Sequence, residues 1–299
     1  MEMEINEPLR NSIVDHLSPI FGSRLDLKEY QPVSGGCINN GGYLRTNYGP
    51  FFLKFNSHAF KGMFETEASG LKLLENANAL HTPTAYVSGV SEDGQHFLVT
   101  EWIGTGKPVA DFWEELGRGL AQLHSQQNTH YGLDFDNYIG SLPQHNDFTN
   151  NWSKFFIDQR LEPQVELGLK QHTLDRSISN RIRGLYPFFE QWFPEEPPSL
   201  LHGDLWSGNL LVDENGKPAI IDPAVYYGHR EMELAFTSLF GGFNERFQAA
   251  YQEAWPLVPN FEERIDLYNL YPLLVHVNLF GGPFVNQLNS VITKFTSAS

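Results

Sequence analysis

An aspartate, an asparagine and a second aspartate stand at spacings that suit phosphate chemistry. Asp204 and Asn209 lie five positions apart in HGDLWSGN, and Asp222 follows two β-prone runs, LLV and AII, which the turn DENGKP joins. We expect this hairpin to bring Asn209 back beside Asp222. An amide oxygen and a carboxylate suit Mg²⁺, which takes few protein oxygens and completes its shell with water and phosphates. Asp204 is then left to face a hydroxyl nucleophile.

This division of labour is the one used in phosphoryl transfer. There, one Asp orients the attacking hydroxyl and accepts its proton, while an Asn and another Asp hold the metal. The spacing of Asp204, Asn209 and Asp222 is the spacing of kinase catalytic loops. An isolated HGD is more often a simple turn, because Asp beside Gly favours turns. The three-part pattern favours the catalytic interpretation.

The N-terminal half holds residues that could bind the phosphates of a nucleotide. Lys54 is the one cation of the apolar strand FFLKF, which follows the Gly-rich stretch SGGCINNGG. A lone strand lysine is usually a surface charge, but its place after this stretch favours a phosphate ligand. Gly35 and Gly36 are candidates for a phosphate cover, although they could equally serve hairpin turns. Glu65 and Glu67 follow on a helix, and spacing alone leaves open which of them pairs with the lysine.

Composition limits the class of protein. The 299 residues are 41% hydrophobic, which is enough to bury a sizeable core in two lobes. A formal net charge of −16 opposes binding to nucleic acid or to an anionic membrane. A single cysteine, Cys37, excludes an internal disulfide and fits a reducing compartment. The acidic start MEMEINEPLR lacks the pattern of a signal peptide, and no segment is apolar enough to span a membrane, so we expect a cytoplasmic protein.

Hydrophobic periodicity changes about a third of the way along the chain. Before that point we expect two hairpins or a three-strand meander over residues 29–56, a helix over 63–77 and strands over 84–90 and 96–103. Beyond it, apolar residues at helical spacing predict helices over 109–126, 152–169 and 174–193.

These elements predict an α+β fold of two lobes. A small, mainly antiparallel β lobe with one key helix would span residues 1–102 and bind nucleotide, and a larger, mainly helical lobe would span 103–299 and carry catalysis. The stretch GTGKPV at the junction imitates a phosphate-binding loop, but that motif needs Gly where Glu101 stands and Ser or Thr where Pro108 stands. We interpret it as a linker.

The length of one segment excludes an ordinary protein kinase. Only eight residues separate Asp222 from Glu231 in DPAVYYGHRE, which leaves no room for an activation segment that docks a peptide. We therefore expect the substrate to be a small molecule or an extended side chain, rather than the Ser or Thr of a folded protein.

The chain strongly resembles the fructosamine kinase family, also called ketosamine 3-kinases, from Ser34 to Phe243. The motifs that carry this resemblance are SGGCINNGG, FFLKFN, MFETE, IGSLPQHN, WSKFFIDQRL, HGDLWSGN and DPAVYYGHREMELAFTSLFGGF. The later segment LYNLYPLLVHVNLFG is similar to that family's tail.

The resemblance implies a fold and an activity. The fold would be the aminoglycoside-phosphotransferase-like version of the protein kinase fold. The activity would be ATP-dependent phosphorylation of the sugar 3-hydroxyl of ketosamines, that is, fructosamines and ribulosamines. The phosphorylated product is unstable and frees the modified amine, so the reaction would be a deglycation repair.

The resemblance also implies roles for particular residues. Lys54 would contact the ATP phosphates and pair with Glu67, Asp204 would be the base, and Asn209 and Asp222 would hold Mg²⁺. In TEWI, backbone groups of Glu101 and Ile103 would meet adenine. Trp206 is similar to the family's sugar-facing aromatic residue, although a core position fits a Trp equally well. Further candidates are Asn146 and Tyr227 for substrate, His202 for orienting the catalytic loop, and His229 and Glu231 at a helix start.

Other readings of the chain remain. It could be an aminoglycoside-type or choline-type kinase of the same fold, since an acidic protein suits a cationic acceptor, or a non-catalytic nucleotide-binding protein. Trp206 favours the ketosamine, and the complete catalytic set argues against an inactive protein.

Cys37 lies in the proposed phosphate cover, so its oxidation could inhibit the enzyme. The presence of Cys37 is explained equally well by the need for a small residue in a turn. Whether the substrate is free or protein-bound, and whether the protein is a monomer or a homodimer, stay open.

Overall fold

The computed structural model describes residues 5–33, 39–57 and 62–296, and it groups the chain into two compact units. The first unit comprises Met1–Phe112 together with Leu210–Pro223, and the second comprises Trp113–Asn209 together with Ala224–Ser299. Each unit therefore consists of two separate stretches of chain.

The first unit is an antiparallel sheet with a helix on each face. The strand order is β1-β2-β3-β5-β4, and β1 to β3 form the meander, one of the two arrangements expected there. The helix predicted over 63–77 and the two strands after it are confirmed. Their bounds are α1 Glu7–Phe21, β1 Leu27–Pro32, β2 Asn40–Thr46, β3 Gly49–Asn56, α2 Met63–Ala77, β4 Ala85–Val90 and β5 His96–Glu101.

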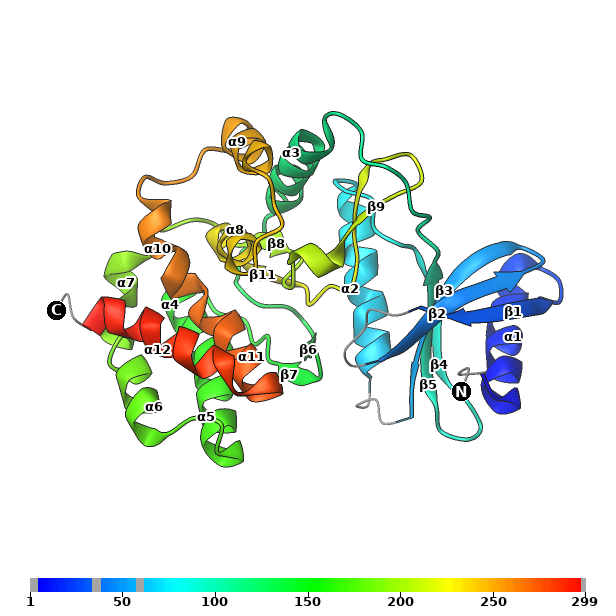
Figure 1. The fold of residues 1–299 in the computed structure, drawn as a ribbon, viewed down its shortest axis with the longest axis horizontal. Helices are drawn as coiled ribbons and strands as arrows, with labels where there is room; N and C mark the ends of the chain where they lie inside the picture. Colours follow the sequence, from blue (N-terminus) through cyan, green and yellow to red (C-terminus); the bar gives the residue numbers. More distant parts are fainter. Residues whose placement is uncertain (1–4, 34–38, 58–61, 297–299) are drawn as a thin grey trace. The chain divides into compact units, whose positions relative to one another are not determined.

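Alternation along β5 explains why both faces of the sheet are covered. Successive strand side chains point to opposite faces. Phe97 and Val99 pack in one core cluster with Leu9 and Ile13 of α1, whereas Leu98 packs in another with Leu71 of α2. Figure 1 shows α1 and α2 flanking the sheet. The helices therefore fix the strand that leads into the predicted adenine connector.

A hairpin from the second half of the chain completes the first unit. β9 (Leu210–Val212) pairs with β10 (Pro218–Ile220) across the predicted turn. The Ile220 amide donates to the His81 carbonyl at 2.9 Å, and the Gly106 and Val109 amides donate to the hairpin at 3.2 and 3.1 Å. The sequence assigned residues 210–223 to the C-terminal lobe, but they pack with the first unit. A functional boundary after residue 102 stays a prediction.

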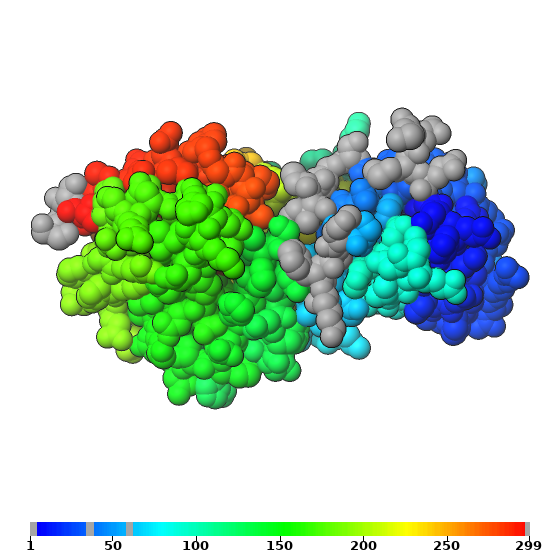
Figure 2. Space-filling model, turned by 90° about the horizontal axis from the view of Figure 1, so that it is seen from below, coloured from blue at the N-terminus to red at the C-terminus, as the bar shows by residue number. Residues whose placement is uncertain are grey.

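The second unit is mainly helical. Figure 1 shows its helices, and in Figure 2 α12 lies along the segment that contains α5 and α6. Two short strand pairs, β6 with β7 and β8 with β11, accompany them. The bounds are α3 Phe112–His124, β6 Asn137–Ile139, β7 Leu142–Gln144, α4 Trp152–Phe155, α5 Glu162–Gln171, α6 Arg176–Arg183, α7 Phe189–Trp192, β8 Ser199–Leu201, β11 Tyr226–Gly228, α8 Arg230–Leu239, α9 Glu245–Ala254, α10 Phe261–Tyr268, α11 Leu270–Phe280 and α12 Pro283–Thr296.

The predicted helices of this unit are confirmed, with interruptions. The helix expected over 152–169 contains a π-helical turn, η1 (Phe156–Leu161), and 3₁₀ turns occur at η2 (Tyr186–Phe188) and η3 (Ser207–Asn209). Aromatic rings of α4, η1 and α10 pack together in the core, and the ring centroids of Trp152 and Phe156 lie 5.3 Å apart. In the described part of the chain, no helix is long and apolar enough to cross a membrane.

Candidate active site

Lys54 is the centre of a buried charge cluster in the first unit. Its Nζ donates to Glu67 Oε1 at 2.5 Å and to Asp222 Oδ1 at 2.6 Å. Only 10% of its side chain is exposed, against 14% for Glu67 and 42% for Asp222. Of the two acids that spacing left open, Glu67 is therefore the one that pairs with the lysine.

Electrostatics keep this lysine charged. Burial opposes the charge, but the carboxylates of Asp222 and Glu67 outweigh it and raise the pKa of Lys54 above its usual value. Asp222 itself has a φ of +57°, a left-handed conformation that is uncommon for residues other than glycine. Such conformations cluster at functional sites, and here it accompanies the ion pair with Lys54.

The predicted adenine connector begins at Glu101, at the end of β5. The Glu101 amide donates to the Thr84 carbonyl at 2.8 Å, so this donor is used within the sheet. Ile103 is 8% exposed. Contact of the Glu101 and Ile103 backbones with adenine stays a prediction.

His81, which the sequence analysis did not select, links this connector to the β9–β10 hairpin. One ring nitrogen lies 3.3 Å from Glu101 Oε1 and the other 3.2 Å from Asp213 Oδ2. Asp213 in turn accepts the Asn215 and Lys217 amides of the hairpin turn at 2.9 and 2.8 Å. The hairpin that leads to Asp222 is thus tied to the end of β5 by one side chain.

In the second unit, the catalytic-loop candidates Asp204 and Asn209 contact each other. The Asn209 amide nitrogen donates to the Asp204 carbonyl at 2.8 Å and to its carboxylate at 2.9 Å. Asn209 is 5% exposed, and its own backbone amide donates to Trp206 at 3.0 Å. The five-residue spacing therefore closes a tight loop in which the asparagine fixes the aspartate carboxylate.

A buried glutamate of α8 holds the start of this loop. Glu233 accepts the His202 amide at 3.0 Å and the Gly203 amide at 2.7 Å, and its carboxylate lies 2.9 Å from His124. Burial alone would raise the pKa of Glu233, but His124, His202 and the Gly203 amide outweigh it and lower that pKa. His202 also accepts the Asp204 amide at 3.3 Å, in line with the loop-orienting role predicted for it.

Replacing Glu233 by glutamine should lower the stability of the protein by about 3 kcal/mol near neutral pH, because an amide cannot accept both loop amides and pair with His124. The folded pKa of Glu233 lies below the ordinary value of a glutamate side chain, about 4.3. The stability difference between wild type and variant is therefore fully present above that value and shrinks as the pH falls below it. Urea unfolding of both proteins from pH 7 to pH 3.5 measures this. A difference that does not change with pH would contradict the role of the charged carboxylate.

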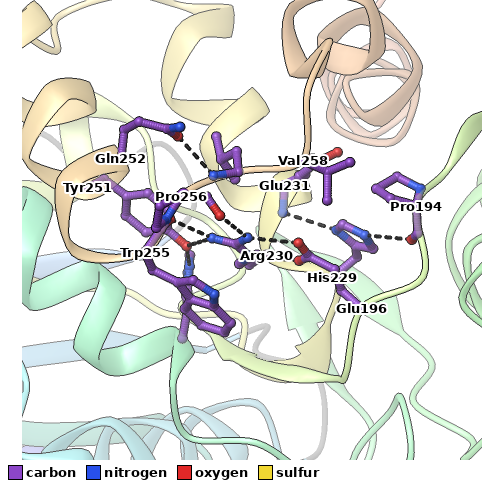
Figure 3. A network of polar contacts seen from close by, with 12 residues as sticks. Pro194, Glu196, His229, Arg230, Glu231, Tyr251, Gln252, Trp255, Pro256 and Val258 are labelled. Atoms are coloured by element: carbon purple, nitrogen blue, oxygen red, sulfur yellow. Dashed lines mark hydrogen bonds and ion pairs between the residues drawn. The ribbon is translucent and has the colours of Figure 1, made fainter.

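The start of α8 is clamped by a second buried network, drawn in Figure 3. His229 caps the helix by accepting the Glu231 amide at 3.2 Å, while its other ring nitrogen lies 3.1 Å from the Pro194 carbonyl. Arg230 pairs with Glu196 through two hydrogen bonds of 2.7 Å. Glu231 is buried and accepts Arg264 at 2.6 and 2.7 Å. The roles of His229 and Glu231 are thus structural: they fix the helix that presents Glu233.

Trp206 is a surface residue. It is 39% exposed, so the alternative of a core position does not hold. Its ring lies over Gly208, where an added Cβ would collide with it, and meets the edge of Phe240 at 6.5 Å between centroids. A sugar-facing role stays a prediction that this exposure permits.

The two weaker substrate candidates differ in their surroundings. Asn146 is 1% exposed; its amide donates to Phe135 and Asn137, and its oxygen accepts Arg160 at 2.8 Å. These contacts make Asn146 part of the scaffold, because its side chain is fully used inside the protein, so the expected substrate contact is not supported. Tyr227 is half-buried on β11, and substrate contact by it stays a prediction.

Three residues of the predicted phosphate cover, Gly35, Gly36 and Cys37, lie outside the described residues. Among the residues that are described, no group of three or more His, Cys, Asp or Glu side chains could hold a metal by itself. Amide and carboxylate oxygens are ligands that Mg²⁺ accepts together with water and phosphates, and binding of Mg²⁺ by Asn209 and Asp222 stays a prediction.

Comparisons with known proteins agree with the family resemblance found in the sequence. Residues 9–298 match the model of the family described as fructosamine kinase. A probable ketoamine kinase of Lactiplantibacillus plantarum is 39% identical over 282 residues, which cover 91% of this chain and 98% of that relative. The protein named protein-ribulosamine 3-kinase, chloroplastic, of Arabidopsis thaliana is 36% identical, with 97% of this chain and 87% of the relative covered.

Solved structures agree with the fold. A crystal structure from Haemophilus somnus, named "putative fructosamine-3-kinase", has a TM-score of 0.87 and 29% identity, and covers 97% of this chain and 99% of that one. Aminoglycoside phosphotransferase APH(4)-Ia has a TM-score of 0.63 at 15% identity, covering 95% of this chain and 97% of that one, and so supports the fold alone. The predicted kinase-like α+β fold is confirmed. Because one family model spans nearly the whole sequence and curated relatives exceed a third identity along it, this chain belongs to the fructosamine kinase family.

Proposed function

We propose that this protein is an ATP- and Mg²⁺-dependent kinase that phosphorylates the sugar 3-hydroxyl of ketosamines. The observation that carries the proposal is the buried Lys54, held between Glu67 and Asp222. A lysine with a paired helix glutamate and a metal-binding aspartate is the part of kinases that positions nucleotide phosphates. Membership of the fructosamine kinase family indicates that the substrates of this chemistry are ketosamines.

The transfer assigns one task to each side chain. Asp204 orients the 3-hydroxyl and accepts its proton as the oxygen bonds to the γ-phosphorus of ATP, while the bond from that phosphorus to the β,γ-bridging oxygen breaks and ADP leaves. Asn209 donates to the Asp204 carboxylate and keeps it aimed. Lys54, kept charged by its two carboxylates, binds phosphate oxygens.

Asn209 and Asp222 would hold the metal. Asn209 directly precedes the β9–β10 hairpin, and Asp222 closely follows it. The two strands of this hairpin pair Leu210 with Ile220. A bound Mg²⁺ would neutralise phosphate charge that builds up as the leaving group departs. The oxygen of Asn209 is available for this, because the contacts described above use the nitrogen of its amide.

The names of the relatives support the substrate class. Those quoted above act, by name, on ketoamines and on protein-bound ribulosamines. In the proposed reaction, loss of the unstable 3-phosphate frees the amine, so the outcome is deglycation. The acidic chain, with its net charge of −16, suits a substrate that carries a protonated amine. We place the enzyme in the cytoplasm, where ATP is supplied and its single cysteine stays reduced.

The test is turnover on a defined panel. The purified protein, ATP and Mg²⁺ are incubated with a ribulosamine, a fructosamine, an aminoglycoside and choline, and ADP is measured. We expect ADP with the ketosamines, and NMR of the product should place the phosphate on O3. ADP with the aminoglycoside or choline alone would replace the proposal by the alternative small-molecule kinase. No turnover, and no Mg²⁺-dependent stabilisation by ATP in a thermal shift titration, would indicate a non-catalytic protein.

A further inference from the structure

Trp206 is one end of a continuous group of rings on the second unit. Phe240 meets its edge, and His276 lies 4.7 Å from Phe240 between ring centroids. Phe284 and Phe280 follow at 4.9 and 5.6 Å from His276. Phe280 is 52% exposed and Phe240 37%, so the group reaches solvent at both positions. We call Trp206, Phe240, His276, Phe280 and Phe284 the aromatic surface.

Two repeated corners of the backbone build this surface. The sequence Leu-Phe-Gly-Gly occurs at residues 239–242, at the end of α8, and again at 279–282, at the end of α11. All four glycines have positive φ, from 50° to 93°. At Gly241, Gly281 and Gly282 an added Cβ would meet nothing within 4 Å, so the left-handed backbone rather than lack of space requires glycine. Each corner ends a helix directly after an outward-facing phenylalanine.

The first corner is packed against the catalytic loop. At Gly242 an added Cβ would lie 2.6 Å from the Cβ of Ser207, the residue after Trp206. The aromatic surface is therefore continuous with the loop that carries Asp204, both through this contact and through the ring pair of Trp206 and Phe240. The aromatic surface and Asp204 therefore belong to the same unit.

The two chain segments that form the corners carry no charged residue in a strongly acidic protein. Residues 234–244 and 270–293 contain no Asp, Glu, Lys or Arg, although 19% of the chain is charged. Burial lowers the pKa of His276, partly opposed by its hydrogen bond to the Pro272 carbonyl. The imidazole is therefore neutral at neutral pH and does not repel a cation.

The chemistry of this surface selects an occupant. Aromatic faces attract alkylammonium groups and pack against apolar side chains, and a contiguous exposed apolar patch marks an interaction site. A ketosamine joins its sugar to an amine that is protonated near neutral pH. If the sugar hydroxyl lies at Asp204 and the sugar at Trp206, the ring contacts from Trp206 to Phe240 and from Phe240 to His276 offer a continuous surface for the part of the substrate beyond the sugar.

We propose that the aromatic surface binds the lysine side chain and neighbouring residues of a peptide or protein that carries the ketosamine. The inference rests on the proposed function and deepens it, since it selects a protein-borne substrate over a free one. In this proposal Trp206 contacts the sugar, and the second corner, with Phe280, contacts the peptide beyond the modified lysine.

The test compares one ketosamine in two contexts, on free Nα-acetyl-lysine and on the same lysine within a nine-residue peptide. We expect Phe280→Ala to lower kcat/KM for the glycated peptide about fivefold, mainly through KM, which corresponds to about 1 kcal/mol. Turnover of the glycated acetyl-lysine should stay within about twofold. Phe148→Ala is the matched control, because Phe148 is also 52% exposed on the second unit, and its ring pairs with His130 outside the surface.

Binding without turnover gives an independent measurement. A peptide whose ketosamine lacks the 3-hydroxyl cannot accept phosphate, and calorimetry should show weaker binding to Phe280→Ala than to wild type or to Phe148→Ala. Equal losses on both substrates, or none on either, would overturn the inference while leaving the kinase activity intact. A wild-type dimer that Phe280→Ala dissociates, with substrate discrimination unchanged, would assign the surface to self-association instead. Failure of wild type on both substrates would instead remove the proposed function.

Discussion

Asp204→Ala should lower kcat for ketosamine phosphorylation about a thousandfold and leave the affinity for Mg²⁺-ATP within about twofold. Proton acceptance by a positioned side chain contributes about 10² to 10⁴ in rate, and this carboxylate also orients the hydroxyl. Lys54, the side chain proposed to bind the phosphates, belongs to the other unit and keeps both of its partners in the variant. Steady-state kinetics gives kcat, and a thermal shift titration gives the nucleotide affinity.

The control for this variant is Asp158→Ala, which removes an exposed carboxylate that pairs only with the neighbouring-turn Lys154 among the contacts described. We expect its kcat to remain at the wild-type value. Wild-type turnover by Asp204→Ala would refute the assignment of Asp204 as the base. A parallel loss of nucleotide binding would show that the substitution disturbs the structure rather than the proton transfer.

Asp222→Asn should be the second most damaging change. The amide keeps the size of the side chain but gives up one of two charged oxygens, so Mg²⁺ binds more weakly and the developing phosphate charge is less well neutralised. We expect kcat to fall about a thousandfold. We also expect the Mg²⁺-dependent part of the stabilisation by ATP, about 2.7 kcal/mol at a hundredfold excess over Kd, to disappear.

The structure suggests how to distinguish loss of the metal from disruption of the cluster of Lys54, Glu67 and Asp222. In Asp222→Asn, Lys54 retains its hydrogen bond to Glu67 at 2.5 Å, so binding of ATP without Mg²⁺ should survive. Asp15→Asn, on the exposed side of α1, is the control for removing one negative charge from the first unit. Retention of Mg²⁺-dependent stabilisation by Asp222→Asn would exclude Asp222 as a metal ligand.

Local sequence signals predicted most of the secondary structure. Gly-rich turns between β-prone runs located β1 to β3, and helical periodicity located α2 and α3. The prediction omitted α1, although its ends carry readable signals: Asn6 accepts the Leu9 amide as an N-cap, and Gly22 ends the helix with a φ of 71°. The π-helical turn at η1 interrupts a helix whose periodicity alone gave no warning of it.

Some residues of the candidate site could be found from local sequence signals, and others could not. Asp204, Asn209 and Asp222 could be selected as candidates because their spacing along the chain is itself the signal. Glu233 and His81 could not, because their partners are distant in sequence: Glu233 holds an amide 31 positions away, and His81 contacts a carboxylate 132 positions away. Such pairs exist only once the tertiary packing has formed. Asn146 shows the converse, since its motif suggested a ligand and its burial makes it a scaffold residue.

The split of the first unit into residues 1–112 and 210–223 has a practical consequence for expression and folding. A fragment that ends at residue 112 would lack the hairpin, and the amides of Gly106 and Val109 would lose the carbonyls of Val212 and Gly216. Neither unit can therefore be produced by simple truncation. During synthesis, the first unit cannot be completed until residue 223 has left the ribosome, so its long-range contacts form late.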